Sequence, residues 1–126
     1  MGTPTHPPVE VPLVLLAGRA LQALRKAAGL SQRRLAAKIG VHGSAIGLLE
    51  SGRIRINFGC QWRIEAALQI PPGTLQTLVY DLPLEAHGYT VVERSCPDGI
   101  GSYPITPLDD LIHATLMRRL APEDPT

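Results

Sequence analysis

Side chains that can hold a negatively charged partner gather in one stretch of the sequence. They are Gln32, Arg33, Arg34, Lys38, Arg53 and Arg55. Guanidinium, ammonium and amide groups donate hydrogen bonds to phosphate oxygens, so this stretch could follow the backbone of a nucleic acid. The sequence contains no phosphate loop, no Ser/His/Asp arrangement with convincing spacing and no nucleophile beside a base, so an enzyme is not expected.

The charge of the chain is divided between two parts. Residues 17–70 hold nine basic and two acidic residues, an excess of seven positive charges, although the net charge of all 126 residues is only +1. The remaining residues hold three basic and nine acidic ones, an excess of six negative charges. This division is typical of a polyanion binder with a separate partner-facing segment. A chance imbalance on solvated faces is the alternative.

Two short helices joined by a tight turn should position the basic side chains. Ser31 is a suitable N-cap for a helix that ends near Ile39, and Gly40 supplies the positive φ of the turn. A further helix should run from about Gly43 to Glu50, followed by a loop over residues 51–59.

Arg33 and Arg34 would lie in the first turn of the earlier helix. The helix dipole disfavours a cation there by roughly 0.3–1 kcal/mol. A DNA phosphate bound at this end would reverse that sign and would also use the free backbone N–H groups. Two solvated arginines tolerated at a surface are the alternative, but the surrounding pattern favours the phosphate.

Three further helices should complete the core of this part of the chain. They are expected at residues 14–28, 60–69 and 74–80, from the helical spacing of apolar residues and the break at Pro71-Pro72-Gly73. A core made mostly of Leu, Ile, Val and Ala suits packed helices better than packed sheets. The expected fold class is therefore mainly α.

The pattern of the sequence changes beyond Asp81. Residues 89–94 and 100–105 have strand character around a turn at 96–99, which predicts a hairpin, and Thr106-Pro107 starts a final helix. An apolar stripe on that helix consists of Leu108, Leu111, Ile112 and Leu116. A lone hairpin and helix cannot bury much surface, so this segment should pack on the first domain or on a second copy of the chain.

Three segments follow from these patterns. Residues 1–12 contain four prolines and should form an extended, poorly ordered arm. Residues 13–81 should form the helical domain, and residues 82–126 a small hairpin-plus-helix appendage.

The cysteines and the hydropathy of the sequence indicate the cellular location and the need for cofactors. Cys60 and Cys96 lie far apart without neighbouring Cys or His ligands, so buried thiols are expected rather than a disulfide or a metal site. No stretch approaches transmembrane length. We expect a cytoplasmic, nucleoid-associated protein that needs no cofactor.

Several short motifs occur in the order and spacing of one known family. They are Leu24-Arg25, Gly29-Leu30-Ser31-Gln32, Leu35-Ala36, Ile39-Gly40-Val41, Ile46, Glu50-Ser51-Gly52-Arg53 and Ala67-Leu68. Over residues 21–78 the chain resembles the lambda-repressor-like helix-turn-helix family, also called the xenobiotic-response-element family, of bacterial and phage regulators. The resemblance implies five packed helices, of which the second and third form the DNA-binding unit.

The resemblance also implies a role for each matching residue. Gln32 would clamp a phosphate, and Glu50 would pair with a basic residue of the first helix, here Arg25. The groove-facing positions of the third helix would be His42, Gly43, Ser44, Gly47 and Leu48. The loop residues that touch the DNA backbone would be Arg53, Arg55 and Asn57.

The third helix departs from the family at its glycines. Gly43 and Gly47 stand where members usually place Arg, Gln, Ser or Thr, and His42 stands at the usual Ser or Thr cap. Three explanations compete: weak base readout supplemented by DNA shape, a close approach to the backbone that glycine permits, and lost DNA binding. The first two together are favoured because the basic side chains are retained.

These observations predict a sequence-specific transcriptional regulator, a repressor that binds double-stranded operator DNA. A homodimer would place two units on half-sites roughly 34 Å apart. Its dimerisation residues would be Leu108, Leu111, Ile112 and Leu116. The alternative is a protein-interaction module on the same fold, such as the antitoxin of a toxin–antitoxin pair, whose acidic C-terminal segment binds a protein partner.

Overall fold

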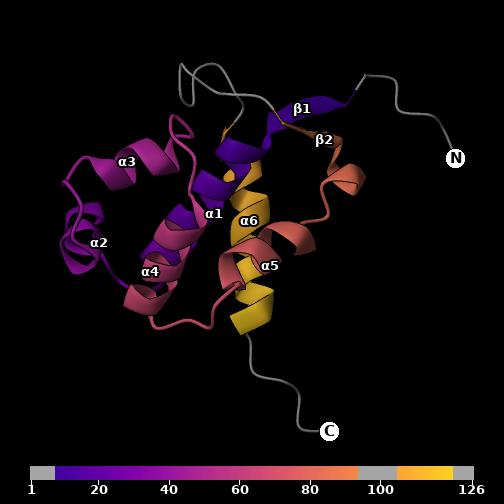
Figure 1. The fold of residues 1–126 in the computed structure, drawn as a ribbon. Helices are drawn as coiled ribbons and strands as arrows, with labels where there is room; N and C mark the ends of the chain where they lie inside the picture. The colour runs from indigo at the N-terminus through magenta and orange to yellow at the C-terminus, as the bar shows by residue number, and fades with distance from the viewer. Residues whose placement is uncertain (1–7, 94–104, 121–126) are drawn as a thin grey trace, which may run out of the picture.

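The computed structural model describes residues 8–93 and 105–120 of the chain (Figure 1). Its α-helices in this part are α1 (Leu13–Ala27), α2 (Gln32–Ile39), α3 (Ala45–Glu50), α4 (Phe58–Leu68), α5 (Thr74–Asp81) and α6 (Ile105–Leu120). A short 3-10 helix (Glu85–His87) and two strands, β1 (Val9–Pro12) and β2 (Tyr89–Val92), accompany them. The expected mainly α class is confirmed. No helix in the described ranges is long and apolar enough to span a membrane.

The helix boundaries follow local signals in the sequence. The Ser31 hydroxyl accepts the N–H of Arg34 at 3.1 Å, as expected for the N-cap of α2. The Asn57 side chain caps α4 in the same way, accepting the N–H of Cys60 at 2.7 Å. Helix α3 begins at Ala45, two residues later than predicted, because Gly43 and Ser44 belong to the turn before it.

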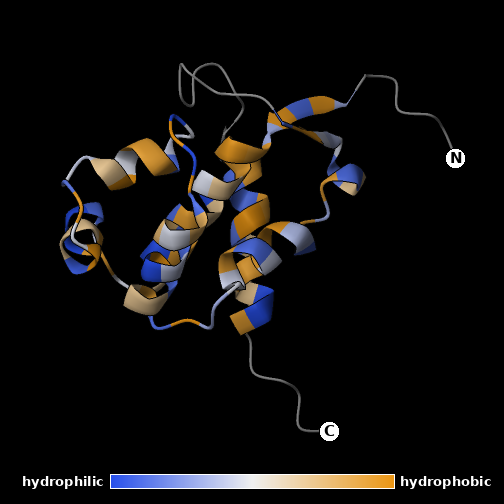
Figure 2. Ribbon diagram, viewed as in Figure 1, coloured by the Kyte–Doolittle hydropathy of each residue, from blue (hydrophilic) through white to orange (hydrophobic). Residues whose placement is uncertain are grey.

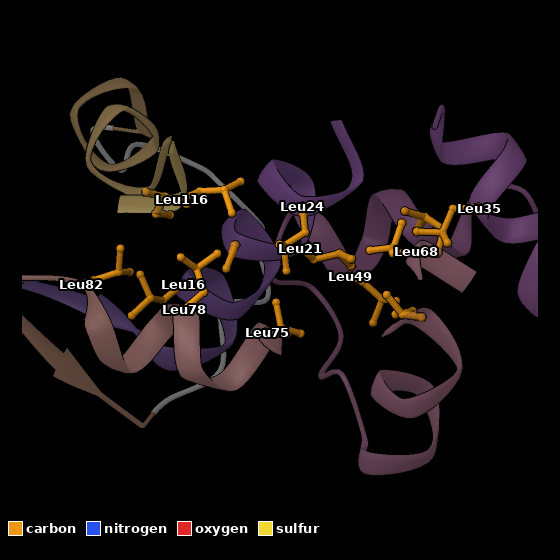
Figure 3. Packing of buried hydrophobic residues seen from close by; sticks show 14 of the residues in the cluster. Leu16, Leu21, Leu24, Leu35, Leu49, Leu68, Leu75, Leu78, Leu82 and Leu116 are labelled. Atoms are coloured by element: carbon orange, nitrogen blue, oxygen red, sulfur yellow. The ribbon is translucent and has the colours of Figure 1, made fainter. Parts of the chain in front are cut away.

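Helix α1 is the central element of the hydrophobic core. Leu16, Leu21 and Leu24 of α1 lie between leucines of α2, α3 and α4 on one side and leucines of α5 and α6 on the other (Figure 3). Residues on both sides of the expected segment boundaries, after residues 12 and 81, contribute to this one cluster. The segment beyond Asp81 is therefore part of the same packed unit.

The two strands form a parallel pair that joins the start of the described chain to the segment after α5. Val9 pairs with Tyr89 and Pro12 with Val92. Hydrophobic and hydrophilic residues alternate along β1, and Val11 is buried (Figure 2). The expected disordered arm is thus wrong for Val9–Pro12, because a strand far along the chain supplies its hydrogen bonds. Residues 1–7 lie outside the described part.

The first strand of the predicted hairpin is present, but it does not pair with the strand that we expected. Strand β2 covers most of the expected first strand, but it lies beside β1. Residues 100–104 of the expected second strand lie outside the described ranges, and Ile105 is already the first residue of α6. A pattern of alternation identifies a strand without showing which strand it pairs with.

The apolar stripe of α6 packs against the chain's own core. Leu108, Ile112 and Leu116 are buried, and Leu111 is half-buried against the same cluster. Arg19 of α1 donates hydrogen bonds from Nε and Nη2 to the Asp109 carboxylate, at 2.8 and 2.5 Å. Of the two alternatives for this segment, packing on the first domain is observed. The dimerisation role expected for the stripe does not fit, because these side chains are already covered.

Glu65 of α4 caps the next helix. Its carboxylate is 2% exposed and accepts the N–H groups of Gly73 and Leu75, each at 3.0 Å. A carboxylate at this position satisfies N–H groups of the helix start and complements its dipole. The contact therefore fixes α5 relative to α4.

Gly18 lets α1 and α3 approach each other closely. A Cβ atom built on Gly18 would lie 2.3 Å from the carbonyl oxygen of Leu49 and 2.8 Å from that of Glu50. Both neighbours are backbone atoms, so they can move away only if the helices separate. The position of α3 thus depends on the absence of a side chain at residue 18.

We predict that Gly18→Ala destabilises the fold by about 3 kcal/mol, the upper end of the usual overpacking penalty. The matched control is Gly43→Ala, since a Cβ at Gly43 meets no atom within 4 Å and its φ is not positive. That control should change stability by less than about 0.5 kcal/mol. Urea denaturation of both variants measures the difference; equal midpoints would contradict the close approach.

Candidate nucleic-acid interface

The turn between α2 and α3 has the expected glycine geometry. Gly40 has φ 73°, and its N–H bonds to Ala37 while that of Val41 bonds to Ala36. Arg63 of α4 donates from Nη2 to the carbonyl oxygen of Ile39, which satisfies the end of α2. The end of α2 and the turn after it are therefore held by both local and long-range contacts.

A buried carboxylate joins helices α1, α2 and α3, which we call the recognition unit. Glu50, at the end of α3, is 2% exposed and accepts hydrogen bonds from Arg25 Nε at 2.6 Å and Arg25 Nη2 at 3.0 Å. Gln32, the first residue of α2, donates to the same carboxylate at 2.9 Å. The pairing of Glu50 with Arg25 that the family resemblance implied is thus observed.

The sequence did not indicate two further members of this network. Gln22 of α1 donates to Glu50 at 3.3 Å, and Arg25 Nη1 donates to the carbonyl oxygen of Leu30 at 2.8 Å. Gln22 lies three residues before Arg25, so both side chains share one face of α1. That spacing could have indicated that Gln22 accompanies Arg25, but it identifies Glu50 as their partner only when the position of Glu50 is known.

The amide of Gln32 lies between the start of α2 and the middle of α3. A Cβ on Gly47 would be 3.6 Å from Gln32 Oε1, which is ordinary van der Waals contact. One N–H of the amide is used by Glu50, and an amide nitrogen carries a second one. Gln32 can therefore still donate to a phosphate, with its orientation fixed by a buried charge.

The predicted cationic contacts are exposed. Arg33 and Arg34 lie in the first turn of α2, Lys38 in its last turn, and Arg53 and Arg55 in the loop after α3. Among the described residues, none of these five takes part in an ion pair. Their charges are available to an external anion.

His42 and Ser44 form a small hydrogen-bonded unit at the entrance to α3. His42 Nδ1 lies 2.9 Å from Ser44 Oγ and also accepts the backbone N–H of Ser44 at 3.3 Å. The ring nitrogen thus takes the place of the hydroxyl that usually caps this turn. Because Nδ1 accepts, Nε2 carries the proton in the neutral ring and can donate outward.

The remaining predicted contact residues differ in their solvent exposure and in whether their polar atoms are already hydrogen-bonded. Gly43 is exposed, Gly47 is half-buried and Leu48 is 37% exposed. The side-chain Oδ1 of Asn57 caps α4, which leaves its NH2 group as the side-chain donor for the predicted phosphate contact.

Other chemistry is not assembled in the described ranges. No group of three or more His, Cys, Asp or Glu side chains there is placed to hold a metal ion. Burial raises the pKa of the Cys60 thiol, against a smaller opposing effect of the nearby Arg63 guanidinium. Cys60 is therefore a neutral packing residue near pH 7.

Comparisons with known proteins agree with this geometry. Residues 21–75 match a family model described as Helix-turn-helix. A search of curated proteins found no match. The matched range begins in α1, ends in α5 and contains the whole Glu50 network. Residues 21–75 therefore form a lambda-repressor-like, or xenobiotic-response-element, helix-turn-helix domain, a DNA-binding domain of transcriptional regulators.

Proposed function

We propose that this chain is a repressor that binds operator DNA as a homodimer. The observation that carries the proposal is the contact of Gln32 with Glu50, which holds the cationic start of α2 beside α3. Residues 13–81 would supply the DNA-binding unit, and the segment after them would brace α1 through α6. Occupying an operator requires no chemistry beyond this binding.

The first turn of α2 is the proposed phosphate clamp. Arg33, Arg34 and the free N–H of Gln32 surround a helix start whose dipole favours an anion. Lys38, Arg53 and Arg55 would extend the contact along the backbone. Such contacts fix the position of the protein on the duplex and do not depend on base sequence.

His42 and Ser44 are the proposed base-reading groups. Nε2 of His42 would donate to an acceptor such as guanine N7 or O6, and Ser44 would hydrogen-bond in either sense. Their mutual hydrogen bond limits the orientations that they can adopt. A bidentate arginine is not available on α3, so we expect moderate specificity, supplemented by DNA shape.

Gly47 is proposed to allow a close approach of α3 to the DNA. No neighbouring atom forces a glycine at this position, because a Cβ there would make only ordinary contacts. A glycine inside a helix costs about 0.8–1 kcal/mol relative to alanine. A functional reason for keeping it is a surface that passes near the sugar-phosphate backbone.

A second candidate function is a protein-interaction module that binds DNA secondarily. Phe58 and Trp62 on α4 favour it, since they are 78% and 55% exposed with ring centroids 6.1 Å apart. Exposed aromatic side chains are common at protein interfaces. Co-purification of a genetically neighbouring protein that Trp62→Ser releases would support this candidate.

Neutralising the clamp should weaken binding to all sequences. We expect Arg33→Gln with Arg34→Gln to reduce the slope of log K against log salt by about 0.9 for each lost phosphate contact. Fluorescence anisotropy with specific and unrelated duplexes measures the slope. The control, Lys26→Gln with Arg118→Gln, removes two exposed charges from α1 and α6 and should leave the slope unchanged.

Altering the proposed base-reading residues, His42 and Ser44, should instead change which DNA sequences the protein prefers. His42→Ala and Ser44→Ala should each reduce discrimination between the best duplex and single-base variants by about 1 kcal/mol at one or two positions. Competition binding with a panel of duplexes measures this difference. Uniform loss across the panel would show that these side chains contact only the backbone.

Gly47→Ala should change stability and DNA affinity in opposite directions. The alanine should raise the free energy of unfolding by up to about 1 kcal/mol, yet lower DNA affinity about tenfold through the added methyl group. Gly59→Ala on α4 is the control, which should not lower affinity. Wild-type affinity in Gly47→Ala would refute the close approach.

A further inference from the structure

A groove that lies away from α2 has the size of a small-molecule site. Its volume is about 510 Å³, and it is lined by α1, α5, β2 and the loop after α3. Ligand sites in proteins are hollows of roughly 300–1,000 Å³, mostly apolar, with a few polar groups that orient the ligand. The apolar wall of this groove includes Leu13, Val14, Ala17, Val79, Leu82 and Val91. Its size and lining therefore suit a small ligand with an apolar body.

Two side chains of opposite charge also line the groove. Arg55 comes from the loop after α3, Glu93 directly follows β2, and both are exposed. Within the described ranges, they form no ion pair with each other or with any other residue. A ligand that lies between them can therefore pair with both charges.

Both charged residues belong to segments that meet the start of α1. Strand β2 pairs with β1, which runs directly into α1, and Glu93 is the next residue after β2. The loop after α3 comes so close to the same helix start that a Cβ on Gly52 would lie 2.9 Å from Leu15 Cα (Figure 1). Arg55 follows shortly after Gly52 in that loop. The two charges therefore lie near one end of the groove, and the apolar wall extends from there along α1 and α5.

We infer that this groove binds a small zwitterion with an apolar body, the chemistry of a free apolar amino acid. Arg55 binds the carboxylate of the ligand and Glu93 binds its ammonium group, through charge-assisted hydrogen bonds. The apolar body of the ligand lies against the wall, where its removal from water favours binding. A ligand with a single charge gains only one of the two ionic contacts.

Ligand binding would also affect DNA binding, a step that rests on the proposed function. Arg55 is one of the proposed phosphate contacts, in the loop that directly follows α3. A guanidinium that holds the ligand carboxylate is drawn away from the phosphate. The ligand and DNA therefore compete for Arg55, and each lowers the affinity of the protein for the other.

The first test measures ligand binding to the full chain without DNA. In NMR titrations, L-phenylalanine and L-leucine should shift the methyl signals of Val79, Leu82 and Val91 to saturation. The controls each lack one feature: phenylpropanoate has no ammonium group, phenethylamine has no carboxylate and free glycine has no apolar body. Each control should bind about tenfold or more weakly than L-phenylalanine, because it loses one set of contacts.

Two charge variants assign the ionic contacts. Arg55→Gln should weaken L-phenylalanine binding about tenfold and leave the affinity for phenethylamine, which has no carboxylate, unchanged. Glu93→Gln should weaken L-phenylalanine binding to a similar extent and leave the affinity for phenylpropanoate unchanged. Both residues are exposed, so thermal melts of the two variants should match wild type.

A matched pair on β2 tests the apolar wall. Val91 lines the groove, whereas the neighbouring Thr90 is exposed but does not line it, as expected from the alternation of side chains along a strand. Val91→Gln should weaken L-phenylalanine binding about fivefold or more, and Thr90→Gln should not. Equal effects of the two substitutions would overturn this placement of the ligand.

Fluorescence anisotropy with duplex DNA tests the competition. Saturating L-phenylalanine should raise the Kd for DNA about fivefold and reduce the slope of log K against log salt by about 0.9, as expected for one lost phosphate contact. Glu93→Gln, which lies outside the proposed DNA contacts, should keep the wild-type affinity for DNA. At the same ligand concentration it should lose most of the response.

The outcomes separate this inference from the proposed function. The inference is overturned if neither L-phenylalanine nor L-leucine shifts the groove signals at millimolar concentration, or if phenylpropanoate or phenethylamine binds as tightly as L-phenylalanine. A ligand that binds without changing the affinity for DNA would overturn the competition for Arg55. A chain that binds the ligand as expected but binds no DNA would refute the proposed function alone.

Discussion

The buried carboxylate of Glu50 is the constraint on which the recognition unit depends. It is held by the guanidinium of Arg25 and the amides of Gln22 and Gln32, so one charged group fixes helices α1, α2 and α3. A buried carboxylate without such partners would cost several kcal/mol, which makes alternative arrangements of these helices unfavourable. The same group orients Gln32 at the start of α2. Stability and the geometry of the proposed DNA-facing surface therefore depend on one network.

The packing around α1 supports this network from both sides. Gly18 allows the backbone of α3 to approach α1, while Arg19, one residue later, binds Asp109 and holds α6 on another face. Helix α6 thus closes the core instead of projecting as a separate dimerisation arm. The proposed homodimer would therefore need a surface other than the α6 stripe.

The sequence alone was enough to predict features set by short motifs, such as helix caps and turns. Ser31 as an N-cap, Gly40 with positive φ and the pairing of Glu50 with Arg25, implied by family resemblance, are all observed. Contacts between residues far apart in the chain were not predictable in the same way. The pairing of β1 with β2, the cap that Glu65 provides for α5, and Arg19 with Asp109 each require knowledge of which elements meet. The short α3 reflects a competition that propensity alone does not settle, since His42 caps a turn at Gly43 and Ser44 before the helix begins.

We propose that helices α2 and α3 read DNA as one half of a symmetric pair. The proposal can be tested by in vitro selection from a random duplex pool, with the purified full chain at near-physiological salt. A homodimer should enrich an inverted repeat whose half-sites are separated by about one helical turn. Binding without enrichment, or no binding at all, would contradict a sequence-specific homodimeric repressor and favour the protein-interaction module.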